Sequence, residues 1–265
     1  MNKKVCLITG ATSGLGKCIS LKLFNEGFKL ILVSKSQSRL DELYNIIGSN
    51  NIIYFCVDLS NIKELKKFLK KVPSIDILIN NAGSFYFEKE KNIKKINKTL
   101  ILNYYAPYLL MHKLMINKKK NEKLVINIGS KALIRSKINI SEINNLDKYN
   151  GWEIYKFSKL LLISITDYFS KIHHKIKFIS FDPGRMETNF GSNNFFLIRS
   201  LIKLYLKILG QSPDIAANKI IKLIKKNKSN SQFIIKKKNI IFFFTRKFQR
   251  NLFIQTNKLL KINAK

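Results

Sequence analysis

Cysteine, histidine and acidic residues are scarce in this chain of 265 residues. It has three cysteines and three histidines, and only 16 acidic side chains accompany 49 basic ones. The cysteines Cys6, Cys18 and Cys56 have no disulfide or metal-ligand spacing, so we expect buried, reduced thiols and a reducing compartment. None of the histidines belongs to a ligand pattern, so no metal site is expected.

Long hydrophobic runs are also missing. No uninterrupted apolar stretch approaches the ~18 residues typical of a membrane-spanning helix, so none is expected. A strand-like run, Val5–Ile8, begins almost at once and leaves no room for the apolar part of a signal peptide. We therefore expect a cytoplasmic protein. The chain has four prolines and no Pro/Gly-rich linker, which favours one α/β domain over residues 1–265.

The charge of the chain is strongly one-sided, with a formal net value of +33. Lysine outnumbers arginine 43 to 6, whereas surfaces that read phosphates or bases more often use arginine, so nucleic acid is not the expected partner. The excess is uneven, since residues 195–265 hold 17 basic side chains and one acidic one, together with apolar runs. This combination makes an anionic membrane surface a candidate partner of the C-terminal part, as a peripheral contact.

Short apolar runs alternate with helical patterns along the chain. Strands are predicted at 5–8, 29–33, 52–57, 75–79, 124–128 and 177–181, with a seventh near 232–235. Helices are predicted at 15–26, 38–47, 62–71, 93–115, 152–172 and 213–226. This alternation is typical of a Rossmann-type, doubly wound parallel sheet with helices on both faces. Strands that are apolar throughout fit such a covered sheet.

A glycine-rich turn with the spacing G-x-x-x-G-x-G follows the first predicted strand and leads into a helix. Glycines at such positions permit a tight turn and let the backbone approach a pyrophosphate, while the helix N-terminus offers N–H groups to the phosphates. A purely structural turn is the alternative, but its place after the first strand favours dinucleotide binding. The residues expected to contact the cofactor here are Thr9, Gly10, Thr12, Ser13, Gly14, Leu15 and Gly16.

The second predicted strand ends at Ser34 and Lys35, where the adenosine ribose of a dinucleotide should lie. An acidic residue there would bind the ribose 2′-hydroxyl, and none is present, so NADP(H) is favoured over NAD(H). Arg39 is either a further contact or only a surface charge. Asp58, followed by Leu59, is placed to accept a hydrogen bond from the adenine amino group. Capping of the next helix is the alternative for Asp58.

Tyr155 and Lys159 lie four residues apart and therefore share a helix face. A nearby ammonium favours the phenolate, so Lys159 is expected to lower the pKa of Tyr155 from its usual ~10. Such a pair arises by chance in a lysine-rich chain. Two further motifs favour a catalytic role for this pair, because Ser130 ends a predicted strand upstream and the glycine turn opens the chain.

Together these motifs resemble the short-chain dehydrogenase/reductase family over nearly the whole chain. After the fourth predicted strand comes Asn80-Asn81-Ala82-Gly83, which is similar to a signature of that family, and Asn81, Ala82 and Gly83 would lie beside the cofactor. The segment Pro183-Gly184 with Thr188 resembles the one that closes over the nicotinamide. By the same resemblance Asn103, Ser130, Tyr155 and Lys159 occupy the catalytic positions.

The resemblance implies a mechanism of hydride transfer. Tyr155 would protonate the carbonyl oxygen during reduction, Lys159 would lower its pKa and hold the ribose hydroxyls, and Ser130 would stabilise the oxyanion. Asn103 would hold a water that relays protons to Lys159. An ordinary helix tyrosine at 155 and a polar filler at 103 are the alternatives.

A narrower similarity points to the retinol-dehydrogenase-like branch. Ser130 and Tyr155 are 25 residues apart, a spacing similar to that of this branch. Further similarities lie in the insert 137–144, the segment 212–214 and the tail 246–261. It implies a lipophilic alcohol/carbonyl substrate such as a retinoid, a steroid, or another aldehyde or ketone. Asp182 departs from the branch, which usually has histidine there.

The resemblance also implies an arrangement of segments. Residues 188–212 would form the substrate loop, and residues 236–265 a basic C-terminal extension. The family pairs subunits through the helices at 93–115 and 152–172, so a homo-oligomer is expected. A catalytically silent cofactor-binding regulator or scaffold is the alternative function.

Overall fold

The computed structural model describes residues 3–48, 51–84, 86, 97–116, 123–135, 139–143, 145–184, 212–226 and 245–262. Six parallel strands form one sheet in the order β3-β2-β1-β4-β5-β6. Their bounds are β1 Val5–Thr9, β2 Lys29–Ser34, β3 Ile52–Cys56, β4 Ile77–Asn80, β5 Lys123–Ile128 and β6 Ile176–Phe181. The predicted doubly wound sheet is confirmed. The seventh strand predicted near 232–235 lies outside the described residues.

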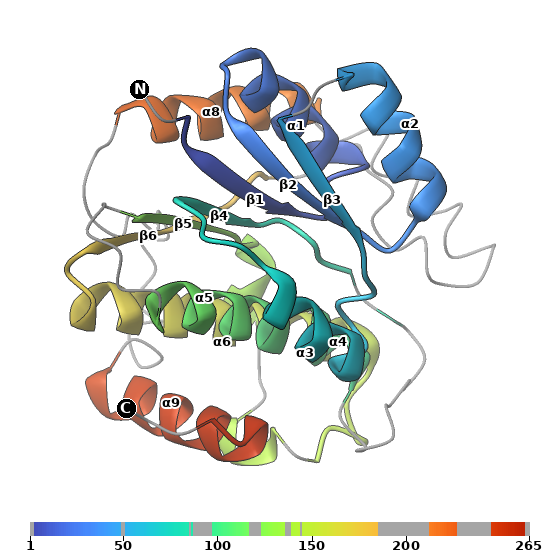
Figure 1. Cartoon of the computed structure of the whole chain (residues 1–265). Helices are drawn as coiled ribbons and strands as arrows, with labels where there is room; N and C mark the ends of the chain where they lie inside the picture. The colour runs from blue at the N-terminus through green and yellow to red at the C-terminus, as the bar shows by residue number, and fades with distance from the viewer. Residues whose placement is uncertain are drawn as a thin grey trace.

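Helices cover both faces of the sheet (Figure 1). One face carries α1 Gly14–Asn25, α2 Gln37–Ile47 and α8 Pro213–Lys226. The other carries α3 Ile62–Lys71, α4 Lys98–Leu100, the π-helical turn η1 Ile101–Tyr105, α5 Ala106–Ile116 and α6 Gly151–Ile172. Two short 3-10 helices, η2 Lys131–Arg135 and η3 Ile140–Glu142, lie between β5 and α6. None of the helices in the described ranges is long and apolar enough to cross a membrane.

Alternate residues of the central strands fill two separate cores. In β1, Leu7 packs with the α5–α6 side, whereas Cys6 and Ile8 pack with the α1–α8 side. Successive side chains of a strand point to opposite faces, so a strand covered on both faces is apolar throughout. The edge strand β3 is different, because it has one neighbour, and Ile53 is 51% exposed there. The expectation of a buried thiol is therefore wrong for Cys56, which is exposed.

The C-terminal helix α9, Arg246–Leu260, lies outside the α5–α6 layer and packs on α6 (Figure 1). Two buried tyrosines, far from α9 in the sequence, form hydrogen bonds with it. The Tyr104 and Tyr108 hydroxyls are each 2.6 Å from a side-chain oxygen of α9, Thr256 Oγ1 and Asn257 Oδ1 respectively. These hydrogen bonds hold α9 on this face of the molecule.

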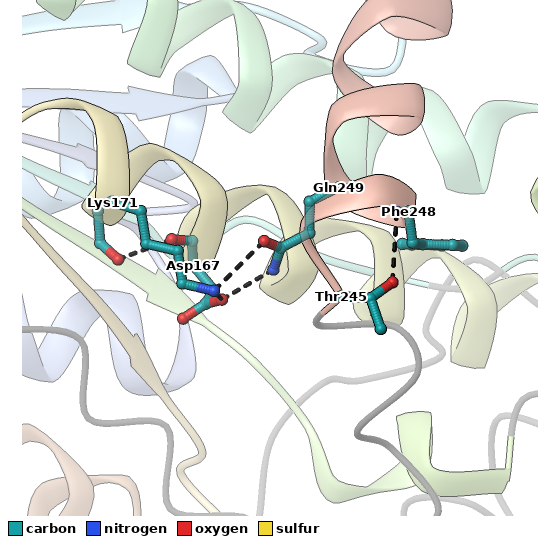
Figure 2. A network of polar contacts seen from close by, with 6 residues as sticks. Asp167, Lys171, Thr245, Phe248 and Gln249 are labelled. Atoms are coloured by element: carbon teal, nitrogen blue, oxygen red, sulfur yellow. Dashed lines mark hydrogen bonds and ion pairs between the residues drawn. The ribbon is translucent and has the colours of Figure 1, made fainter.

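A polar network joins the first turn of α9 to α6. Asp167 Oδ2 accepts hydrogen bonds from Gln249 Nε2 at 2.8 Å and from Lys171 Nζ at 2.6 Å (Figure 2). Thr245 caps α9 by accepting from the Phe248 amide at 3.3 Å. The subunit pairing expected through the helices at 93–115 and 152–172 stays a prediction.

Candidate active site

The candidate site lies at the carboxyl ends of the strands, where the strand order reverses between β1 and β4. Ligands of open α/β sheets bind at this point, because the loops that follow the two strands diverge to opposite faces. The glycine turn follows β1, Asn81 follows β4, Ser130 follows β5 and Asp182 follows β6. The topology therefore brings motifs from distant parts of the chain to one edge.

The glycine turn is fastened to the end of β4. Asn81 Nδ2 donates to the carbonyl oxygens of Thr9 and Gly10, at 2.9 and 3.1 Å. In return Thr9 Oγ1 accepts from the amides of Asn81 and Ala82, each at 3.0 Å. Gly10 has a φ of +63°, in the region that favours glycine. A Cβ on Gly16 would lie 2.0 Å from the Gly10 carbonyl oxygen, so α1 approaches the turn only because residue 16 is glycine.

The N-terminus of α1 lacks the side-chain cap that the neighbouring long helices have. Ser13 is its N-cap residue, but its side chain makes no capping hydrogen bond, and the first turn of the helix has no acidic residue. In α2, α3, α6 and α9 the capping side chains accept from first-turn amides, and these residues are Ser36, Asn61, Asn150 and Thr245. The amides at the start of α1, beside Gly14 with a φ of +48°, are therefore arranged for an external anion. This fits the phosphates of a dinucleotide.

The end of β2 lies directly against the turn. The Thr12 and Ser34 hydroxyls are 2.8 Å apart, and the Ala11 amide donates to the Val33 carbonyl oxygen at 3.2 Å. Ser34 is buried, so its hydroxyl positions this loop. The side chains of Lys35 and Arg39 are exposed where α2 begins, which leaves them as the candidates for a ribose phosphate.

Asp58 lies at the end of β3 and does not cap a helix. Its Oδ1 accepts from the amide and hydroxyl of Ser60, at 2.9 and 2.7 Å. The N-cap of α3 is Asn61, which accepts from the Lys63 amide at 3.1 Å. The capping alternative is therefore wrong for Asp58. The Leu59 side chain is buried in the core, so only its backbone can face a ligand.

Ser130, Tyr155 and Lys159 come together beside the end of β5. The Ser130 side chain hydrogen-bonds the buried Tyr155 hydroxyl. Lys159 Nζ lies 5.9 Å from the centre of the Tyr155 ring and donates to the Ile128 carbonyl oxygen at 2.9 Å. The spacing of four residues on α6 turns both side chains toward the strand end, as predicted.

Burial shapes the protonation of this cluster. It raises the pKa of Tyr155 to about 12, an effect that the Ser130 hydrogen bond opposes and the charge of Asp182 increases. It lowers the pKa of Lys159 to about 8, and Asp182 opposes that shift. We expected Lys159 to lower the pKa of Tyr155; in this structure the loss of solvation outweighs any such effect. Tyr155 is thus held as a neutral acid at physiological pH.

Asn103 lies fully buried in η1, a π-helical turn of the kind that often marks functional sites. Its Nδ2 donates to the Ser84 carbonyl oxygen at 2.8 Å and to Ser158 Oγ at 3.0 Å. Its Oδ1 accepts from the Ser84 amide at 3.0 Å and keeps capacity for a second donor. Ser158 Oγ in turn donates to the Tyr155 carbonyl oxygen at 2.7 Å. Asn103 therefore cross-links this helix to α6 and is more than polar filler.

Gly83 lies close to two functional side chains. A Cβ at this position would lie 3.2 Å from Lys159 Nζ and 3.4 Å from Asn103 Oδ1. Both polar atoms therefore border the space that a methyl group would take. This arrangement is compatible with the water expected between Asn103 and Lys159, and that role stays a prediction.

The end of β6 contributes Asp182, Pro183 and Gly184. Pro183 is buried, and Gly184 has a φ of +76°. Asp182 Oδ1 accepts from the Gly184 amide at 3.0 Å and so holds this turn. Thr188 lies outside the described residues, as do most of those expected to form the substrate loop.

Trp152 was missed as a site residue by the reasoning from sequence. Its ring stacks on the Tyr155 ring, with centres 5.2 Å apart and planes at 16°, and the residue is 42% exposed. It lies three residues before Tyr155, so helix periodicity was the signal that would have found it. It gives the catalytic cluster an aromatic, partly open border.

Comparison with known proteins places this geometry in a family. The family model of the short chain dehydrogenases matches residues 4–195. Human dehydrogenase/reductase SDR family member 12 is 28% identical over 194 residues, which are 70% of this chain and 61% of the human protein. The 11-beta-hydroxysteroid dehydrogenase-like 3 of Arabidopsis thaliana is 35% identical over 114 residues, 39% of this chain and 37% of that protein. The chain thus spans less than two thirds of these curated relatives.

Solved structures share the fold. The short-chain dehydrogenase from Sphingobium yanoikuyae in complex with NADPH has a TM-score of 0.68 at 19% identity, over 99% of this chain and 97% of that one. A 4-hydroxyisoleucine dehydrogenase complexed with NADH has a TM-score of 0.67 at 19% identity, over 86% and 96% of the two chains. The family match over most of the chain, together with this fold, shows that the chain belongs to the short-chain dehydrogenase family of oxidoreductases, with an NAD(P)-binding fold.

Proposed function

We propose that this protein is an NADP(H)-dependent oxidoreductase that transfers hydride between the nicotinamide and a lipophilic alcohol/carbonyl pair. The observation that supports it most is the cluster of half-buried Ser130 with buried Tyr155 and Lys159, at the same sheet edge as a glycine turn shaped for a dinucleotide. A silent scaffold of the same fold has no need for such a cluster, and it would bind cofactor without turnover.

The residues divide the chemistry between them. A bound nicotinamide supplies or accepts the hydride. Tyr155 donates a proton to the carbonyl oxygen, and its pKa of about 12 keeps it protonated for that step. Ser130 is placed to donate to the same oxygen as negative charge develops there. Lys159, held by the Ile128 carbonyl, provides the positive charge that stabilises the phenolate left behind.

Two observations favour a lipophilic substrate. Trp152 offers an exposed aromatic surface in contact with Tyr155, and the sequence is similar to a branch that acts on lipophilic carbonyls. The test is consumption of NADPH with a panel of aldehydes, ketones and quinones of rising hydrophobicity. Turnover that rises with hydrophobicity supports the proposal. If no carbonyl in the panel is reduced with either NADPH or NADH, the enzymatic function is wrong.

Cofactor choice should depend on Lys35. The wild type is expected to prefer NADPH, and Lys35→Glu should raise the KM for NADPH about tenfold or more while changing that for NADH little, because a charge-assisted hydrogen bond to phosphate is lost. Steady-state kinetics with both cofactors measure this. Lys219→Glu, an exposed charge reversal on α8, is the control. Equal use of both cofactors by the wild type would contradict the preference for NADP(H).

The outer face of α9 is the proposed contact with an anionic membrane surface. Its exposed residues include Ile254, 52% exposed, and the helix contains no acidic residue. The basic residues exposed on and just after this helix are Arg246, Lys247, Arg250, Lys258 and Lys261. Each basic side chain near such a surface contributes about 1 kcal/mol of attraction.

Co-sedimentation with vesicles tests this contact at physiological salt. The protein is expected to sediment with vesicles rich in phosphatidylserine and to stay in solution with phosphatidylcholine alone. Glutamate at positions 247, 250 and 258 should abolish sedimentation. Equal recovery with both kinds of vesicle, or none with either, would remove the proposal.

A further inference from the structure

Asp182 is a carboxylate beside the catalytic cluster for which the proposed mechanism has no role. It follows β6 directly, and the register pairs Phe181 with Ile128 of β5, so Asp182 lies beside the strand end that leads into Ser130. The Gly129 amide donates to the Phe181 carbonyl oxygen at 2.8 Å, which holds the two strand ends together. Asp182 is followed by Pro183 and Gly184, which are the last described residues of this segment.

Among the described residues, a hydrogen-bond donor is found for one of the two carboxylate oxygens of Asp182. Oδ1 accepts from the Gly184 amide at 3.0 Å. Oδ2 is shielded from solvent and has no hydrogen-bond partner among the described residues. Buried polar atoms are nearly always paired, and an isolated one usually reflects a functional requirement or a bound group. A turn alone would be satisfied by a serine or an asparagine, so the structural role of Oδ1 does not explain the charge.

The charge of Asp182 acts on the two titratable groups of the catalytic cluster. It raises the pKa of both Tyr155 and Lys159. Lys159 is 4% exposed, and the hydrogen bond described for its ammonium goes to a neutral carbonyl, so burial strongly favours the uncharged amine. The charge of Asp182 opposes this loss of the Lys159 charge, and no ion pair between Lys159 and a carboxylate is found among the described residues.

The other charged groups described on the elements around β6 have partners of their own or lie away from Lys159. The elements that pack on β6 are β5 and α6. The end of β5 presents Gly129 and Ser130, which are uncharged, while Lys123 lies at its opposite end and donates to the Leu114 carbonyl oxygen. On α6, Glu153 and Lys156 lie 3.9 Å apart as a pair of their own. Asp167 and Lys171 belong to the network with α9. Within the described part of the chain, the groups whose pKa is shifted by Asp182 are Tyr155 and Lys159.

We propose that Asp182 is a positioning residue of this active site, whose carboxylate holds Lys159 as an ammonium and so extends the alkaline range in which the site works. The inference deepens the proposed function and rests on it for its kinetic readout. Reduction needs a protonated Tyr155 and a charged Lys159. Removal of the negative charge lowers the pKa of both groups, so activity should be lost at a lower pH.

The test replaces Asp182 by asparagine, which keeps the shape and an oxygen acceptor for the Gly184 amide. The pH profile of kcat/KM for carbonyl reduction is expected to fall above about pH 8 in the wild type, where Lys159 loses its proton. In Asp182→Asn the alkaline limb should shift to lower pH by about half a unit or more. Asp214→Asn is the charge-matched control, because Asp214 pairs with Lys22 on the surface of the opposite layer, and its profile should overlay that of the wild type.

A titration that does not need turnover separates this inference from the proposed function. Lysine labelled with ¹³C at Cε is titrated by NMR, and the Lys159 signal is assigned by its loss in Lys159→Arg. A lower pKa for Lys159 in Asp182→Asn than in the wild type supports the proposal, even if no substrate has been found. Identical titration curves, or identical pH profiles in an active enzyme, would overturn it while leaving the oxidoreductase function intact.

Discussion

Tyr155→Phe is expected to lower kcat for carbonyl reduction by a factor of about 10²–10⁴, the usual contribution of a positioned general acid. The change removes one hydroxyl, the atom that hydrogen-bonds Ser130 and that burial keeps protonated. The ring itself remains stacked on Trp152, so the helix and the border of the site should keep their shape. Initial rates of NADPH oxidation with the best carbonyl of the panel measure the effect.

The controls for Tyr155→Phe separate chemistry from structure. Affinity for NADPH, measured by calorimetry, should change little, because the glycine turn is untouched. Tyr168→Phe removes a hydroxyl from the same helix at a half-buried position outside the cluster and should leave kcat unchanged. If Tyr155→Phe retains near wild-type kcat, Tyr155 is an ordinary helix residue and the proposed mechanism is wrong.

Gly16→Ala is expected to damage cofactor binding strongly. Its Cβ would lie 2.0 Å from the Gly10 carbonyl oxygen and 2.6 Å from Asn81 Nδ2. Moving either group costs free energy, because the Gly10 carbonyl belongs to the backbone and the Asn81 side chain holds the turn against β4. The helix α1 must therefore move away from the turn, at a cost of about 1–3 kcal/mol in the free energy of unfolding, as in overpacked cores.

Loss of that geometry should weaken NADPH binding about tenfold or more, because the phosphates depend on the position of the first turn of α1. Chemical unfolding of the cofactor-free protein and calorimetry with NADPH measure the two effects. Gly48→Ala is the matched control, with a φ of +54° but nothing within 4 Å of the added Cβ. It should cost about 1 kcal/mol of stability and leave NADPH affinity unchanged. Wild-type affinity in Gly16→Ala would mean that the turn does not bind the phosphates.

Most elements of the fold follow from local patterns. The helix predicted at 62–71 coincides with α3, and the predicted strands end within one or two residues of those observed. The largest shift is at the start of β4, which begins at Ile77, since Ile75 is buried in the loop before it. Apolar runs of five residues between helical patterns leave few other arrangements than a covered parallel sheet.

The catalytic cluster was predictable for a similar reason, and its energetics were not. Tyr155 and Lys159 share a face of α6 by their spacing, whichever surface that face meets. The predicted direction of the pKa shift of Tyr155 was wrong, because the shift depends on how completely the neighbouring segments exclude water. The exposure of Cys56 was missed likewise, because only the strand order makes β3 an edge.

The succession of strands and helices along the chain, and the residues at each strand end, follow from the amino-acid sequence alone, because periodicity, glycine and proline act over a few neighbouring positions. Which of those residues meet depends on the three-dimensional fold. It brought Asn103 to Ser158, Asp182 to the catalytic pair, and α9 to Tyr104 and Tyr108. Such contacts join residues far apart in the chain, and burial, charge and hydrogen bonding across that distance have no signature in local sequence.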